Sequence, residues 1–267
     1  DIVENVHMNR WKELYQSCNV ALENWRASHP DSPASKWSDN FYMTGDYDCA
    51  SIDYKPQYAD AGFSSLVNFY FPKNGDLDNI TYTWQAYADS VASHSDWHPF
   101  SYLNNSYHRD ADMANMIDCA TTLLLSPGVA QVFYGDETCR ELSEARLNVD
   151  SDQAFRSDMN WDNINATHLQ HFQKLGKIRS SNPVIGTGRQ RTLDVHTCIR
   201  YNDTDTILIR LKPNEGESIP TDNIFHDGAT VIELYTGRVA TVNNGFVSFP
   251  KYENKIAIIK ELKSINK

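Results

Sequence analysis

Apolar residues recur along the chain at two different spacings, and the change from one to the other falls near residue 186. Before that point, apolar positions three or four residues apart predict amphipathic helices. These helices are expected over residues 6–26, 83–92, 111–125 and 168–179. Between them lie short runs that are apolar throughout and predict strands buried on both faces. The predicted strands cover residues 41–44, 63–71, 100–103 and 129–134.

Strands that alternate with helices in this way are typical of a parallel sheet covered by helices. Residues 138–164 are mostly polar and predict a long loop. From Arg191 onward, short runs rich in Val, Ile, Thr and Tyr are separated by turn sequences such as Asn244-Gly245. We therefore expect two domains: an α/β domain over residues 1–186 and a small antiparallel β-sandwich over residues 187–267.

The composition narrows the classes of partner. The formal net charge is −11 without a visible cluster of Lys and Arg, which argues against duplex nucleic acid, because its phosphates must be neutralised. No apolar run approaches the roughly 20 residues that a membrane-spanning helix needs. Aromatic residues make up 12% of the chain, which suits either sugar stacking or an aromatic-rich core. The five cysteines form no CxxC pair, which disfavours a zinc or redox motif and leaves free thiols and disulfides both open.

The most specific sequence feature is the run LLLSPGVAQVFYGDE, residues Leu123–Glu137. It resembles the last helix, turn and barrel strand of the alpha-amylase family of glycoside hydrolases. Three further segments, YMTGD (42–46), SYLNN (101–105) and RSDMNW (156–161), resemble motifs of that family in the same order. The amino-acid sequences of these segments are closest to those of the periplasmic bacterial alpha-amylases. The resemblance implies the second half of a (β/α)8 TIM-type barrel, strands five to eight, followed by the β-sandwich.

The same resemblance assigns two catalytic positions. Retaining glycosidases use one carboxylate as nucleophile and another as acid/base, roughly 5 Å apart. Asp1 aligns with the nucleophile, and an ordinary polar residue at a cut chain end is the alternative. Asp46 stands where the family has a glutamate acid/base, one methylene longer. Asp48 has two interpretations: a substitute for Asp46 or a solvated loop charge.

The family's third carboxylate has no counterpart here. Aligned on Tyr102-Leu103, the expected His-Asp pair falls on Ser106-Tyr107; shifted by one residue, it falls on Asn105-Ser106, and Arg109 then matches a family arginine. The candidates for sugar binding are Tyr107, His108 and Arg109, although His108 is also read as an exposed loop histidine. Asp110 reaches the site only if the loop is rearranged, and Asp112 is expected to cap the next helix.

Three functions follow from these residues. The first is retaining hydrolysis of alpha-1,4-linked glucans by Asp1 and Asp46. The second is a catalytically impaired relative that binds carbohydrate or serves as an assembly subunit, and the third is a non-carbohydrate interaction protein. Asp136-Glu137 is interpreted as part of the barrel rim, and Trp97, His98 and Trp161 as core aromatics or sugar platforms.

The resemblance also suggests partners and a location. The ligand is expected to be an alpha-glucan or maltooligosaccharide, and an upstream half-barrel would come from the same or another chain. No metal ligands are assigned, although calcium is possible by family resemblance. A periplasmic or secreted location is favoured.

Overall fold

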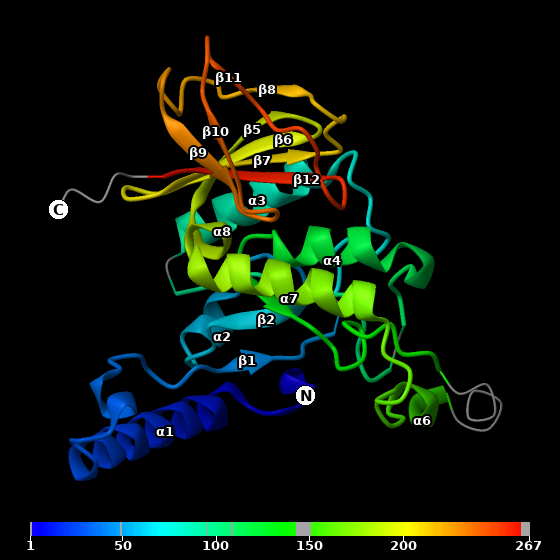
Figure 1. The fold of residues 1–267 in the computed structure, drawn as a ribbon. Helices are drawn as coiled ribbons and strands as arrows, with labels where there is room; N and C mark the ends of the chain where they lie inside the picture. Colours follow the sequence, from blue (N-terminus) through cyan, green and yellow to red (C-terminus); the bar gives the residue numbers. More distant parts are fainter. Residues whose placement is uncertain (1, 49, 95, 108, 143–150, 263–267) are drawn as a thin grey trace.

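The computed structural model describes residues 2–48, 50–94, 96–107, 109–142 and 151–262 (Figure 1). A parallel sheet lies toward one end of the molecule and an antiparallel sheet lies at the other (Figure 1). A layer of helices separates the two sheets. The architecture therefore contains the α/β part and the antiparallel part that the sequence pattern predicts.

Four short strands form the parallel sheet, in the order β1-β2-β3-β4. Their bounds are Thr44–Gly45 (β1), Ser65–Asn68 (β2), Phe100–Tyr102 (β3) and Val129–Gln131 (β4). Each strand overlaps one of the predicted apolar runs but is shorter than it. The strand order follows the chain order, so β1 and β4 are the two edges of this sheet.

The four expected helices are present: α1 (Met8–Ser28), α3 (Ile80–Ser93), α4 (Met116–Leu124) and α7 (Ala166–Ser181). Shorter helical segments are η1 (Val3–Asn5), η2 (Pro33–Lys36), α2 (Pro56–Ala59), η3 (Met113–Asn115), α6 (Ser151–Phe155) and α8 (Val184–Thr187). The prediction of a continuous loop over residues 138–164 is wrong at α6. Ala154 is buried there, but a single buried position in one turn is too short to produce a helical period.

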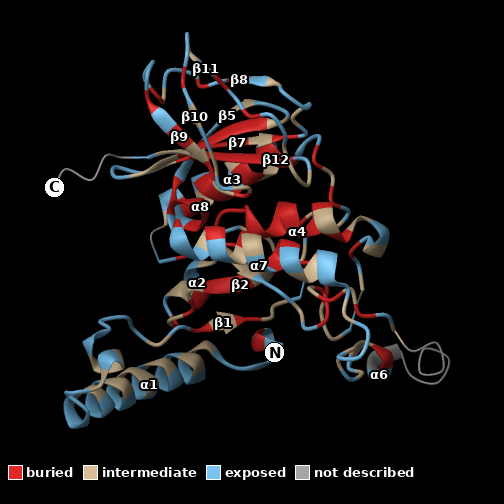
Figure 2. Ribbon diagram, viewed as in Figure 1, coloured by how far each residue is buried: buried red, intermediate tan, exposed pale blue. Residues whose placement is uncertain are grey.

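Helix α1 leaves its predicted apolar stripe partly in solvent. None of its residues is buried (Figure 2), and Leu14 and Trp25 are 45% and 40% exposed. Among the contacts of this helix with the rest of the chain, Trp11 Nε1 donates to the Val3 carbonyl oxygen over 3.0 Å. The Trp11 ring also meets Phe63 edge-on, with the ring centroids 5.5 Å apart. The period predicted the helix correctly, and the described residues cover only part of its apolar stripe.

The antiparallel part consists of a larger and a smaller sheet. Six strands pair in the order β10-β9-β12-β7-β6-β5, and β11 pairs with β8. Their bounds are Arg189–Asp194 (β5), Thr197–Tyr201 (β6), Thr206–Leu211 (β7), Ser218–Pro220 (β8), Thr230–Glu233 (β9), Arg238–Thr241 (β10), Phe246–Ser248 (β11) and Ile256–Glu261 (β12). Ile219 and Val247 from the smaller sheet join Leu208 and Ala257 from the larger one in a single apolar cluster. That cluster holds the two sheets together by excluding water.

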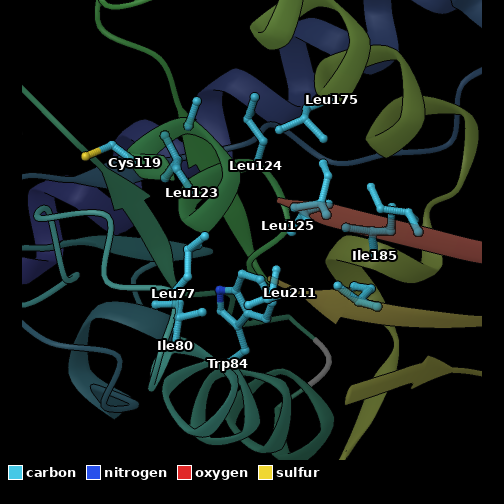
Figure 3. Close-up of a cluster of buried hydrophobic side chains, with 14 of the residues drawn as sticks. Leu77, Ile80, Trp84, Cys119, Leu123, Leu124, Leu125, Leu175, Ile185 and Leu211 are labelled. Carbon is cyan, nitrogen blue, oxygen red and sulfur yellow. The ribbon is translucent and has the colours of Figure 1, made fainter. Parts of the chain in front are cut away.

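The largest apolar core extends from the helices into the antiparallel sheet (Figure 3). Trp84 of α3, Leu123 of α4 and Leu175 of α7 are all fully buried in it. Leu211 of β7 and Ile258 of β12 belong to the same cluster. The helices therefore pack against the antiparallel sheet through continuous hydrophobic contacts rather than through a flexible linker.

The Ser126-Pro-Gly128 turn between α4 and β4 has a clear physical requirement. Gly128 has φ +85°, and an added Cβ would lie 2.3 Å from the Pro99 carbonyl oxygen, so only glycine fits. Arg179 of α7 donates to the carbonyl oxygens of Leu124 and Ser126 over 2.9 and 2.7 Å. The turn and the arginine thus fix the direction in which β4 leaves the helix layer.

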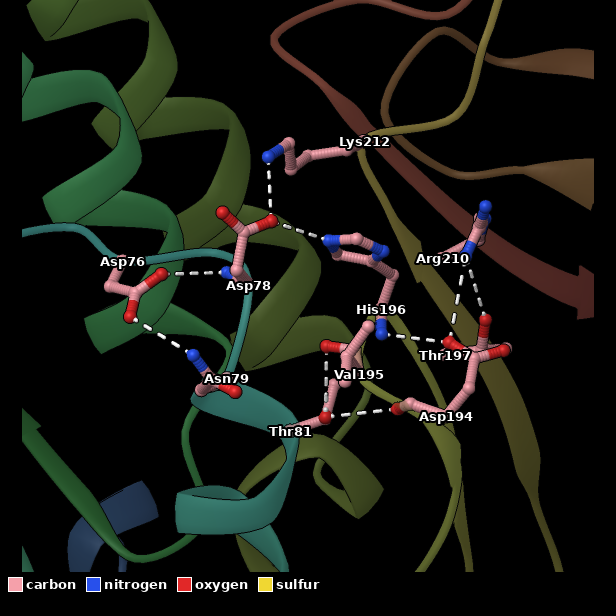
Figure 4. A network of polar contacts seen from close by, with 10 residues as sticks. All are labelled: Asp76, Asp78, Asn79, Thr81, Asp194, Val195, His196, Thr197, Arg210 and Lys212. Atoms are coloured by element: carbon pink, nitrogen blue, oxygen red, sulfur yellow. Dashed lines mark hydrogen bonds and ion pairs between the residues drawn. The ribbon is translucent and has the colours of Figure 1, made fainter.

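A polar network joins the segment before α3 to the antiparallel sheet (Figure 4). The Asp78 carboxylate accepts from His196 Nε2 over 2.7 Å and from Lys212 Nζ over 2.6 Å. These two hydrogen bonds lower the pKa of Asp78 below its ordinary value. Thr81 Oγ1 donates to the Asp194 and Val195 carbonyl oxygens nearby. The network is largely exposed, so it orients the contact more than it stabilises it.

Candidate functional site

A cavity of about 350 Å³ opens at the carboxyl ends of the four parallel strands. Its walls come from every strand of that sheet and from the loop after β3. The lining residues are Thr44, Gly45, Asp46, Val67, Phe69, Phe100, Tyr102, Asn105, Ser106, Tyr107, Gln131 and Phe133. Loops at this end of parallel strands are where α/β barrels build their active sites. We call this cavity the strand-end pocket.

Among the described residues that line the strand-end pocket, Asp46 is the only one with a carboxylate. Burial raises its pKa, and the negative charges of Glu4 and Asp48 act in the same direction. Gly45 precedes it in tight packing, because an added Cβ would lie 2.9 Å from side-chain atoms of Val3, Phe63 and Leu66. A carboxyl group with a raised pKa is suited to donating a proton.

The start of the chain runs beside Asp46. The Val3 amide donates to the Asp46 carbonyl oxygen over 2.9 Å, and Val3 is buried. Asp1, the candidate nucleophile, lies outside the described residues.

The loop after β3 brings one of its three candidates to the pocket. Tyr107 lines the cavity. Arg109 does not: its guanidinium donates to the Arg140 carbonyl oxygen, and burial lowers its pKa while Asp136 acts against that change. His108 lies outside the described residues. The structure therefore places Asp46 and Tyr107 in one cavity and directs Arg109 away from it.

The remaining carboxylates of this loop have other partners. Asp110 lies 3.4 Å from Lys73 Nζ. Asp112 accepts a hydrogen bond from the Ala114 amide over 3.0 Å, so it caps the helical turn η3 as expected. Neither residue lines the strand-end pocket, and the described part of the loop supplies no third carboxylate to it.

Asp136 is buried beneath the same loop. Its Oδ1 accepts from Asn104 Nδ2 over 2.7 Å, and Asn104 Oδ1 accepts from the Ala111 amide over 3.0 Å. Asp136 Oδ2 has no hydrogen-bond partner among the described residues. Burial raises the pKa of Asp136 to about 6, although the Asn104 hydrogen bond and the Arg109 charge lower it. The Asn104–Asp136 pair thus ties the base of the pocket loop to the segment that follows β4.

Apart from Tyr107, sequence reasoning did not identify the aromatic lining of the pocket. Val67 and Phe69 are two residues apart, so they project from the same face of an extended strand. The Phe69 and Tyr102 rings meet edge-on, with their centroids 5.9 Å apart. Alternation within the run 63–71 was the signal available for this lining. Of the other aromatic candidates, Trp97 is buried in the core, while Trp161 is 71% exposed.

Two kinds of feature are absent from the described residues. In the described ranges, no group of three or more His, Cys, Asp and Glu side chains is arranged to hold a metal ion. No described helix combines the length and the apolar character that crossing a bilayer requires.

The chain is similar to known amylases in sequence and in fold. No protein-family model matches it. It is 29% identical over 224 residues to the periplasmic alpha-amylase of Escherichia coli (strain K12), a match that covers 78% of this chain and 31% of that protein. The solved alpha-amylase of Anoxybacillus superposes with a TM-score of 0.62 at 14% identity, covering 98% of this chain and 58% of the other.

The alpha-amylase of Geobacillus thermoleovorans, solved with acarbose, also has a TM-score of 0.62, at 13% identity, with 97% of this chain and 58% of the other covered. The chain thus spans about a third of the length of its E. coli relative. Sequence and fold agree with the motifs in residues 42–46 and 123–137. Taken together, they show that this chain is similar in sequence and in fold to part of the length of alpha-amylase-family glycoside hydrolases.

Proposed function

We propose that this chain binds alpha-1,4-linked glucans in the strand-end pocket and hydrolyses them poorly. The observation that carries the proposal is the pocket lining itself: several aromatic rings surround a single described carboxylate, Asp46. Aromatic faces pack against the apolar faces of sugar rings, and polar groups then fix their orientation. The acarbose complex of the Geobacillus relative supports a glucan-like ligand.

The weak-hydrolysis part of the proposal rests on the carboxylate positions. Asp46 is one methylene shorter than the family glutamate, and a misplacement of about 1 Å costs on the order of 100-fold in rate. The positions of the third carboxylate are Ser106 and Tyr107, which carry no charge to hold a distorted sugar. Asp110 and Asp112 are engaged elsewhere. Binding therefore survives these substitutions better than catalysis does.

An active retaining hydrolase is the second candidate, favoured by the raised pKa of Asp46. In that mechanism Asp46 protonates the leaving glycosidic oxygen, and Asp1 attacks the anomeric carbon. The hydrogen bond from Val3 to Asp46 brings the neighbouring backbone segments together. Asp46 would then remove a proton from the water that releases the sugar.

We further propose that residues 1–186 form half of a barrel and residues 187–267 a β-sandwich. Edges β1 and β4 have no further strand beside them in the described ranges, and an open sheet edge needs a cover. The exposed part of the α1 stripe, at Leu14 and Trp25, needs the same cover. Strands supplied by the same or another chain would complete the barrel and bury both.

Maltooligosaccharide turnover and binding test these functions together. The purified protein, in its complete form, is incubated with a chromogenic maltooligosaccharide beside Asp1→Asn and Asp46→Asn variants. Asp110→Asn is the matched control, because it makes the same chemical change outside the pocket. Calorimetry then measures maltoheptaose binding to each protein.

The proposal expects measurable binding with little turnover. Efficient turnover that disappears in Asp1→Asn and Asp46→Asn, but not in Asp110→Asn, would replace it with the active hydrolase. If the protein shows no turnover and no binding, both functions are refuted, and the non-carbohydrate interaction protein remains as the interpretation.

A further inference from the structure

The Arg140 side chain holds residues 155–157, a segment that follows the parallel strands in the chain, and we call this set of hydrogen bonds the clamp. The Arg140 side chain is almost fully buried. The guanidinium donates to the Phe155 carbonyl oxygen over 2.8 Å and to the Ser157 carbonyl oxygen over 2.8 Å. It also donates to Ser157 Oγ over 2.6 Å. Arg140 therefore holds the backbone on both sides of Arg156.

Two neighbouring contacts fix the same segment. The Arg140 guanidinium lies over the Tyr134 ring, 4.4 Å from its centroid, and Tyr134 OH donates to the Ser157 carbonyl oxygen over 2.9 Å. Farther along, Thr138 Oγ1 donates to Asn160 Oδ1 over 2.7 Å. Residues 155–160 are thus attached to the segment after β4, residues 134–140, by three side chains.

Arg156 reaches from this held segment to the pocket loop. Its guanidinium carbon lies 4.8 Å from the centroid of the Tyr107 ring, within the range of a cation–π contact. Tyr107 lines the strand-end pocket and is 42% exposed. The same loop is attached a second time, because Arg109 donates to the Arg140 carbonyl oxygen. Both Tyr107 and Arg109 are therefore linked to Arg140.

We propose that Arg140 is a positioning residue for the pocket wall: through residues 155–157 it holds Arg156 against one face of the Tyr107 ring. This inference rests on the proposed glucan binding. A half-exposed tyrosine that is held before the ligand arrives loses less side-chain freedom on binding. Restraining one such side chain changes the dissociation constant by about two- to tenfold.

A double-mutant cycle on glucan affinity tests the coupling. Arg140→Lys keeps the charge but loses the planar fork that serves two carbonyl groups. We expect it to raise the Kd for maltoheptaose about two- to tenfold in the native background, and to have no further effect when Tyr107 is replaced by alanine. Equal losses in both backgrounds would show a general structural role and overturn the proposal.

Arg156→Gln provides a second perturbation at an exposed residue, so the test does not depend on whether Arg140→Lys folds. It should also weaken binding only when the Tyr107 ring is present. Arg10→Gln is the matched control, because Arg10 lies exposed on α1, paired with Glu13 and away from the pocket. Weaker binding in the control as well would overturn the assignment.

Fluorine NMR of 3-fluorotyrosine placed at position 107 separates the clamp from the ligand. Without any sugar, Arg140→Lys and Arg156→Gln should move this resonance toward that of a free fluorotyrosine, and Arg10→Gln should not. An unchanged resonance overturns the clamp. A changed resonance in a protein that binds no maltoheptaose supports the clamp and refutes the proposed glucan binding.

Discussion

Replacing Asp136 by asparagine should stabilise the protein above pH 6 and have little effect near pH 4. The folded state holds this carboxyl in a buried site that raises its pKa from 3.8 to about 6. Between those values the unfolded chain releases a proton that the folded chain keeps. The folded state therefore loses stability as the pH rises through this window, and an asparagine, which does not titrate, avoids the loss.

The size of the effect follows from the two pKa values. One pKa unit corresponds to about 1.4 kcal/mol, so the rise from 3.8 to about 6 corresponds to about 3 kcal/mol at neutral pH. This is an upper value for Asp136→Asn, since the new amide must also fit beside the unpaired Oδ2 position. Asn104 can still donate to the remaining carbonyl oxygen.

Urea unfolding of both proteins between pH 4 and pH 8 measures the difference in the free energy of unfolding. Buried His171, whose pKa burial lowers to about 4, makes the folded state more stable as the pH rises, which is opposite to the effect of Asp136. Both proteins contain His171, so its contribution cancels in the difference. The difference should grow with pH and level off above pH 7. A difference that is independent of pH, or that grows as the pH falls, would refute the assignment of a raised pKa to Asp136.

The other predictions concern burial and backbone conformation. Burial lowers the pKa of His171 from 6.5 to about 4, so His171→Gln should remove a stability loss of up to about 3 kcal/mol between pH 6.5 and pH 4, measured by urea unfolding. Gly62→Ala should lower the Tm by several degrees, because Gly62 has φ +97° and a Cβ would lie 2.3 Å from Tyr15 Cγ. Gly176→Ala in α7, where a Cβ meets nothing within 4 Å, should instead stabilise by about 1 kcal/mol.

The spacing of apolar residues and the turn residues predicted the helices, strands and turns, because these elements depend on residues that are close in the sequence. The apolar runs placed each parallel strand, and the Ser-Pro-Gly128 turn marked where α4 ends. The period of α1 predicted a helix, yet periodicity reports which residues share a face and not what covers that face. Leu14 and Trp25 of α1 belong to the predicted apolar face and are nevertheless exposed.

The site was less accessible from the sequence because its contacts join distant residues. Asn104 and Asp136 are 32 residues apart and meet only when β3 and β4 lie side by side. Arg156 meets Tyr107 across a segment read as a loop. The position of Asp46 was predicted from a motif, whereas the aromatic lining needed the arrangement of all four strands.

The helix layer determines whether the chain can be cut into two fragments that fold independently. Leu123 and Leu175 contribute to a core that Leu211 and Ile258 of the antiparallel sheet also share. A cut at residue 187, where the sequence pattern changes, would uncover these apolar side chains on both fragments. We therefore expect the two sequence regions to unfold in one transition. Neither fragment should remain soluble alone, and exchanging the C-terminal part between relatives would require matched helix surfaces.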